Sequence, residues 1–163
     1  MRMILIDYEV LGRPIAQPRI KAARRGNLIK MYTPNDNNVK EYKQAVREGF
    51  ENALGKIAVE KKVAFPHQGL VQVGAHFYFP RPVGMMQERL GMDPIHHLAK
   101  PDIDNVLKAM LDALTGIAWK DDRQVWFMDC RKYYAGVMRD EDNKKVSCPP
   151  STKIYLSFYN EVI

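Results

Sequence analysis

The sequence predicts an α+β fold with two layers, in which a mixed or antiparallel sheet of about four strands packs against two helices. Strand-like and helix-like segments are interspersed along the chain, and no regular strand–helix–strand repeat links them. The length of 163 residues, 46% of them hydrophobic, is sufficient for one domain with a sizeable core. We therefore expect a single domain over residues 1–163.

The first expected element is a strand over Met3–Val10, and a basic arm over residues 12–34 follows it. The N-terminal apolar run is short and charged early, which indicates a strand and not a secretory signal. Gly12, Pro14 and Pro18 exclude a helix in the arm. The arm is therefore expected to be extended.

The charge of the arm suggests a polyanionic partner. Between Arg13 and Lys30 it contains six basic residues and no acidic one, and the whole chain has a formal net charge of +6. Such a local excess is typical of a nucleic-acid contact, although a solvated loop explains it equally well. The candidate DNA-binding residues are Arg13, Arg19, Lys21, Arg24, Arg25, Lys30 and Lys100.

A helix is expected over Asn38–Leu54, where apolar residues recur at three- and four-residue steps. The run Gly69–Phe79 is rich in β-branched and aromatic residues and ends at Pro80, which predicts a strand. Residues 83–99 show no clean period, so we expect an insert loop there, with one helical turn at 87–90.

The second helix is expected over Asn105–Thr115, whose apolar residues form one continuous stripe. Asp104 suits its N-cap, and Gly116 suits the C′ position after its end. The remaining segments are expected to be a strand, a polar loop and a strand, over Gln124–Tyr134, 135–150 and Thr152–Tyr159.

Four aspartates flank the second helix. Asp102 and Asp104 stand two residues apart in an extended segment after a proline, so their side chains should project the same way. Asp121 and Asp122 lie in the turn after the helix, which can fold back toward a neighbouring strand edge. Carboxylates brought together need a cation, and Mg²⁺ held by one or two carboxylates can orient a phosphate. For Asp104 alone, a helix cap is the simpler explanation.

Lys108 lies one turn beyond Asp104 on the same helix face. It can form an ion pair there, or it can reach a phosphate oxygen or the attacking water. A basic chain with an acidic cluster fits a substrate whose phosphate approaches a metal ion. Phosphodiester hydrolysis is therefore the natural reaction class.

The sequence KPDIDNVLK at 100–108 and the later KDDRQV at 120–125 resemble the signature of RusA-type Holliday junction resolvases, a family common in phages and prophages. The segments GRP at 12–14, QPR at 17–19 and YTP at 32–34 are similar to the pattern of the phage members. The resemblance covers most of the chain from Ile4 to Tyr134. Residues 83–99 and 134–150 depart from the shortest members, so cleavage-sequence preference is not implied.

The resemblance implies a homodimeric, Mg²⁺-dependent endodeoxyribonuclease that nicks four-way branched DNA symmetrically, with Mn²⁺ as a substitute metal. It implies that Asp102, Asp104 and Asp122 are essential metal ligands. It also implies a catalytic Lys108 and a secondary ligand, Asp121. Such an enzyme would act in the cytoplasm of a bacterial or phage-infected cell, at the nucleoid.

Two strands are candidates for the dimer surface, because their aromatic content suits an interface. They are Val71–Phe79 and Val125–Tyr134, the latter with Trp126 and Phe127.

Three other functions are compatible with parts of the sequence. They are a DNA-binding protein of the same fold that does not cut, a branched-DNA nuclease of broader specificity, and a DxD glycosyltransferase that binds Mn²⁺. The intact acidic set argues against the first, and no nucleotide-binding unit precedes the aspartates as the third would require. Cys130 and Cys148 have no metal-ligand spacing, His96 and His97 are expected in a loop, and no apolar run is long enough to span a membrane.

Overall fold

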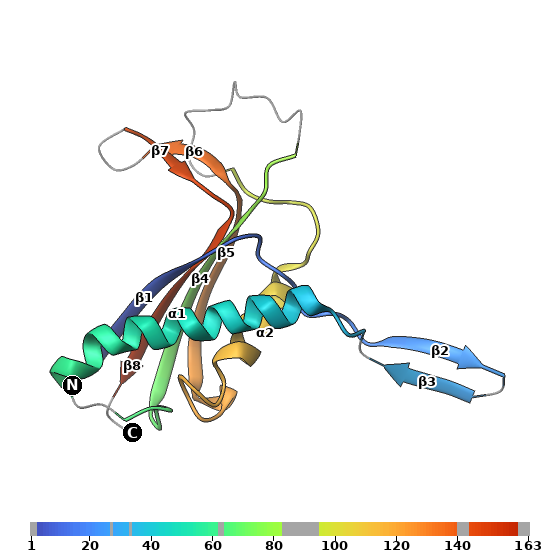
Figure 1. The fold of residues 1–163 in the computed structure, drawn as a ribbon, viewed down its shortest axis with the longest axis horizontal. Helices are drawn as coiled ribbons and strands as arrows, with labels where there is room; N and C mark the ends of the chain where they lie inside the picture. The colour runs from blue at the N-terminus through green and yellow to red at the C-terminus, as the bar shows by residue number, and fades with distance from the viewer. Residues whose placement is uncertain are drawn as a thin grey trace.

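The computed structural model describes residues 3–26, 28–32, 34–61, 64–82, 95–139 and 144–159. Its centre is a four-stranded sheet in the order β1-β8-β4-β5 (Figure 1). β8 runs antiparallel to both of its neighbours, and β4 and β5 run parallel. The strands are β1 (Met3–Leu11), β4 (Leu70–Phe79), β5 (Val125–Tyr134) and β8 (Ser151–Tyr159).

Two helices, α1 (Asn37–Lys61) and α2 (Ile103–Leu114), cover one face of this sheet (Figure 1). In β1 the alternate residues Ile4 and Ile6 are buried beneath them, while Leu5 on the other face is exposed. From the helices, Phe50 and Met110 complete the core. The predicted α+β class, with a mixed sheet and two helices, is confirmed.

Two hairpins extend the chain where loops were expected. The basic arm contains β2 (Lys21–Arg25) paired with β3 (Leu28–Tyr32), and the loop at 135–150 contains β6 (Gly136–Arg139) paired with β7 (Lys145–Cys148). The positive φ of Gly26, +64°, provides the turn conformation between β2 and β3.

Several predicted boundaries change. α1 continues past Leu54 to Lys61, since one glycine, Gly55, costs a helix only about 1 kcal/mol. The prediction that Asp104 is the N-cap of α2 is wrong. Asp102 holds that position and makes no side-chain capping bond, while Asp104 lies in the first turn.

Residues 95–97, at the end of the predicted insert loop, run along β5. Tyr134 N donates to Ile95 O at 2.8 Å, and His97 N donates to Lys132 O at 3.0 Å. The His97 ring is buried against Phe79, with ring centroids 4.3 Å apart. The helical turn predicted at 87–90 lies outside the described residues.

β4 lies between β8 and β5, so both of its edges are paired and it offers no open edge to a second chain. Val71, Val73 and Phe77 of β4 are fully buried. The strand Val71–Phe79 is therefore part of the core. Across the described residues, no helix is long and apolar enough to cross a membrane.

Candidate active site

The segment that leads into α2 is fixed by β5. Lys132 Nζ donates to the carbonyl oxygens of Ala99 and Pro101, at 3.0 and 2.7 Å. This places Asp102 at the N-terminal end of α2, with Asp104 in the following turn. Within the part of the chain that the structure describes, the exposed Asp104 carboxylate makes no hydrogen bond or ion pair.

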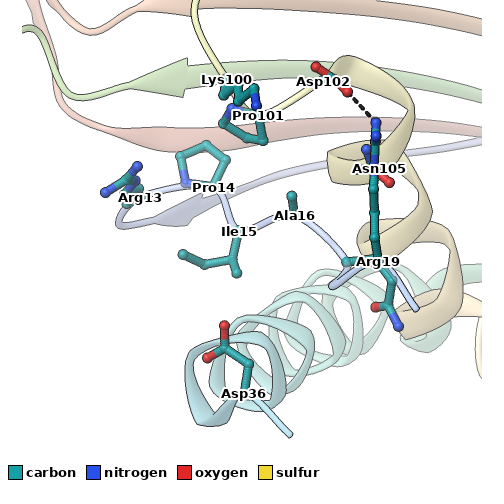
Figure 2. A pocket seen from close by; sticks show the side chains of 11 residues that line it. Arg13, Pro14, Ile15, Ala16, Arg19, Asp36, Lys100, Pro101, Asp102 and Asn105 are labelled. Carbon is teal, nitrogen blue, oxygen red and sulfur yellow. Dashed lines mark hydrogen bonds and ion pairs between the residues drawn. The ribbon is translucent and has the colours of Figure 1, made fainter. Parts of the chain in front are cut away.

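The basic arm is anchored to the same end of α2. Gln17 N donates to Asn105 O at 2.9 Å, and the Arg19 guanidinium forms an ion pair with the Asp102 carboxylate (Figure 2). With its amide oxygen turned toward Arg19, the Asn105 side chain accepts from Arg19 Nη2 and Nε at 3.1 and 3.2 Å. Asn105 thus helps to hold Arg19 beside Asp102.

A cleft of about 520 Å³ lies between the arm and α2 (Figure 2). Its charged lining consists of three cations, Arg13, Arg19 and Lys100, and two carboxylates, Asp36 and Asp102. The first backbone N–H groups of α2 also lack helical partners, which favours an anion at this end. The cleft can therefore accept a phosphate next to a carboxylate.

The other end of α2 is built differently. Asp122 accepts hydrogen bonds from the Thr115 hydroxyl and, at 3.0 Å, from Trp119 Nε1. Thr115 is the C-cap of α2, and Trp119 is fully buried. The Asp122 carboxylate is thus held in one place by groups that α2 and the following turn supply.

Asp121 stabilises the short 3-10 helix η2 (Asp122–Gln124). Its carboxylate accepts from Arg123 N at 2.9 Å, and Gln124 Oε1 in turn accepts from Asp121 N at 2.9 Å, which forms a capping box. The Arg123 guanidinium also donates to Asp121 and holds the pKa of that carboxyl below its usual value. The Asp121 carboxylate is therefore engaged in hydrogen bonds within its own turn.

The two acidic pairs do not meet within one chain. α2 has 12 residues and so rises by about 18 Å between its ends. Among the described residues, no three His, Cys, Asp or Glu side chains are grouped so that they could hold a metal ion. A single chain therefore does not bring the two acidic pairs together, because the whole of α2 separates the Asp121–Asp122 turn from Asp102.

Lys108 lies between the two ends. Its Nζ is 3.6 Å from Asp112 Oδ1, while Lys43 Nζ of α1 is 3.1 Å from Asp112 Oδ2. The Lys108 side chain is 65% exposed and that of Lys43 is 21% exposed. Lys43 therefore joins the two helices, and Lys108 remains accessible to a substrate.

The predicted DNA-binding residues fall into two groups. Arg13, Arg19 and Lys100 line the cleft, whereas Lys21, Arg24 and Lys30 are exposed on the β2–β3 hairpin. Arg25 lies in β2, and its side chain is outside the described part of the structure. The first part of the basic arm therefore forms a wall of the cleft, and the second part forms the β2–β3 hairpin, which projects from the molecule (Figure 1).

A family model described as endodeoxyribonuclease RusA matches residues 12–141. The chain belongs to the RusA family. A relative from Bacillus subtilis (strain 168), described as uncharacterized protein YqaN, is 28% identical over 144 residues, which are 85% of this chain and 94% of the relative. The matched residues include the cleft, α2 and both acidic pairs. The resemblance to this family that the sequence suggested is confirmed.

Sequence reasoning missed the residues that position the acids in this RusA-family chain. Gln17 and Asn105 anchor the arm, Lys132 fixes the loop before α2, and Thr115 and Trp119 hold Asp122. Asn105 adjoins the acidic motif, so its place in the sequence was a usable signal. The role of Lys132 depends on contacts between distant segments, which no local pattern reports.

Proposed function

We propose that this RusA-family protein is a Mg²⁺-dependent endodeoxyribonuclease that resolves four-way DNA junctions by paired hydrolysis of phosphodiester bonds. One observation supports it above all others: a cleft with three cations ends at the Asp102 carboxylate, with Asp104 in the next turn. Cations attract the DNA backbone, and carboxylates beside them are useful only if a metal ion neutralises them where the phosphate approaches.

The residues at this end suit Mg²⁺. The ion prefers oxygen ligands and is commonly held by one or two carboxylates together with phosphate oxygens and water, which Asp102, Asp104 and the substrate would supply. Mn²⁺ accepts the same ligands. When bound, such an ion polarises a phosphoryl oxygen and lowers the pKa of a bound water. Arg19 must release Asp102 first, and an exposed ion pair of this kind contributes only about 0–1 kcal/mol.

The remaining residues bind and orient the DNA strand. Arg13 and Lys100 hold the phosphate in the cleft, and Arg19 joins them after it leaves Asp102. Lys108, one turn further along α2, donates to the oxygen on which negative charge develops. Each of these roles uses a side chain on the cleft or on the exposed surface of α2.

A homodimer accounts for two coordinated nicks, because one chain has a single acidic set and a junction has near two-fold symmetry. The dimer surface is best supported at the first half of β5. Residues 95–97 pair with the end of this strand, but among the described residues its outer edge is open around Trp126 and Phe127, which are 57% and 42% exposed. Since Asp122 lies about 18 Å along α2 from Asp102, it can share a metal ion with Asp102 and Asp104 only if it comes from a second copy.

The experiment is cleavage of a synthetic four-way junction with Mg²⁺, with EDTA as the control. Paired nicks at symmetric positions on opposing strands are expected. Binding without cleavage would instead identify a DNA-binding protein that does not cut. Equal cleavage of flaps and three-way junctions would identify a branched-DNA nuclease of broader specificity.

Light scattering at micromolar protein measures the assembly. We expect the mass of a dimer, and of a monomer when Trp126 and Phe127 are both replaced by Ser. A monomeric wild type with full resolving activity would contradict the dimer.

A further inference from the structure

The β2–β3 hairpin exposes large apolar side chains that nothing else in the described chain covers. Leu28, Ile29 and Met31 are 76%, 70% and 65% exposed. The hairpin extends away from the sheet and from both helices (Figure 1). Clustered apolar side chains on a projection mark a surface that binds a partner.

The register of the hairpin places its two lysines and the apolar pair Ile29 and Met31 on opposite faces. Opposed residues share a face of a two-stranded ribbon, and successive residues point to opposite faces. The opposed pairs on one face are Lys21 with Tyr32, Ala23 with Lys30 and Arg25 with Leu28, and those on the other are Ala22 with Met31 and Arg24 with Ile29. One face therefore carries two lysines together with Tyr32 and Leu28, and the other carries Ile29 and Met31 beside a single arginine.

We propose that the hairpin enters the branch point of a DNA junction, where Ile29 and Met31 pack against exposed base-pair faces while Lys21 and Lys30 contact the flanking phosphates. The proposal rests on the proposed function, because it takes branched DNA as the substrate. It adds an element that recognises the branched structure of the DNA and that is separate from the aspartates at the ends of α2.

Charge and position favour DNA as the occupant. The segment from Arg13 to Lys30 contains no acidic residue, so the apolar pair sits in a uniformly positive setting. Arg19, two residues before β2, pairs with Asp102, so the base of the hairpin adjoins the cleft. Strands of five residues extend about 17 Å, and the ribbon fits a major groove about 12 Å wide.

The branch point is favoured over a continuous duplex by the cost of insertion. Apolar side chains that wedge between base steps must unstack them, which opposes binding. At a branch point the stacking is already interrupted, so the same insertion is easier. A second copy of the hairpin is a poorer occupant for this face, because two positive hairpins repel one another.

The test uses the full-length protein with EDTA, so that no strand is cut, and a junction with 2-aminopurine at the branch point. Binding of the wild type should raise the fluorescence by unstacking the probe, and a linear duplex with the same probe should respond little. The double variant Ile29→Ser, Met31→Ser should still bind but lose this rise. Its preference for junction over duplex should fall about tenfold.

A matched double variant, Lys21→Ala with Lys30→Ala, alters the opposite face. At saturating protein it should keep the fluorescence rise, while the slope of log K against log salt flattens by about 0.9 for each phosphate that the variant no longer neutralises. No slope change there would mean that the two lysines do not contact phosphates, which also overturns their part of the proposal.

Three other results would overturn the proposal. They are no rise with the wild type, an unchanged rise with the Ile29 and Met31 variant, or a monomeric mass for that variant when the wild type is a dimer, which would assign the apolar face to a second copy. Because nothing is cut in this assay, failure of the proposed nuclease activity would appear separately, as intact junction with Mg²⁺.

Discussion

The two ends of α2 present the same residue type in opposite settings. At the C-terminal end, Asp122 accepts from Thr115 and from the buried Trp119, so its position is fixed by the fold. At the N-terminal end, Asp102 has an exposed arginine partner and Asp104 has none among the described residues. One acid is therefore oriented by the chain itself, whereas the other two are available to a metal ion.

The largest expected effect comes from removing the available carboxylates. Asp102→Asn and Asp104→Asn should each lower Mg²⁺-dependent cutting by roughly a hundredfold or more, because each would remove a carboxylate of the proposed metal site. Junction binding, measured by gel shift, should stay the same or tighten as negative charge is removed near phosphate. Asp122→Asn should behave alike, and Asp121→Asn should be milder because Arg123 already holds that carboxylate.

Wild-type cutting in any two of the variants at Asp102, Asp104 and Asp122 would refute the assignment. A thermal scan of each variant shows whether a loss of cutting reflects a loss of folding.

Lys108 lies between the two ends, and Lys43 offers a matched control because both lysines contact Asp112. Lys108→Ala should slow cutting by about 10² to 10³ if its charge stabilises the reacting phosphate. Lys43→Ala removes the shorter ion pair and should leave the cutting rate near that of the wild type. Equal rates for the two variants would mean that Lys108 has only a structural role.

The next prediction concerns the free energy of unfolding. Asp122→Ala leaves the buried Trp119 N–H without its acceptor, which should cost about 1–3 kcal/mol. Asp104→Ala loses only a favourable charge in the first turn of α2, worth about 0.3–1 kcal/mol. Urea unfolding measures both, and Asp122→Asn, which keeps an acceptor oxygen, is the control. Equal losses for the two alanine variants would remove the distinction between the ends.

The sequence alone predicts those features of the molecule that depend on local patterns, and it does not predict those that depend on contacts between distant segments. Periodicity located all four strands of the main sheet and both helices, because apolar alternation and helical spacing are local signals. The motif indicated the four aspartates as candidates, but it did not indicate that the two pairs lie apart. The local sequence does not determine where the turn after α2 lies. The turn is held against the segment before β4 by hydrogen bonds between distant residues, from His67 N to Ala118 O and from Gln124 Nε2 to Gly69 O.

The hairpins illustrate a second limit. The proline and glycine residues of the basic arm excluded a helix, but the pairing of β2 with β3 satisfies backbone groups between two short segments without a strong alternating pattern. The cleft could not be predicted either, because it too depends on contacts between separate segments. Arg13, Arg19 and Lys100 come from two distant segments that only the tertiary fold brings together.

The smallest expected effect is on the pH dependence of stability, and it comes from His97, which lies away from both ends of α2. Burial lowers the pKa of His97, so the unfolded state binds a proton more readily than the folded state. Stability should be full above about pH 6.5 and fall as the pH drops from there through the lower folded pKa. His97→Phe should reduce this slope but not remove it, because burial also lowers the pKa of His76. An unchanged slope in thermal scans from pH 7.5 to about 5 would contradict the role of His97.

The most direct test of the shared site is to mix two inactive variants. Asp102→Asn and Asp122→Asn are combined, allowed to exchange subunits, and assayed on a four-way junction with Mg²⁺. If Asp122 of one copy acts with Asp102 and Asp104 of the other, each mixed dimer regains one intact site, and single nicks without paired resolution should appear. If both variants form dimers and exchange subunits but the mixture cuts no more than either variant alone, the two ends of α2 do not share a site across the dimer.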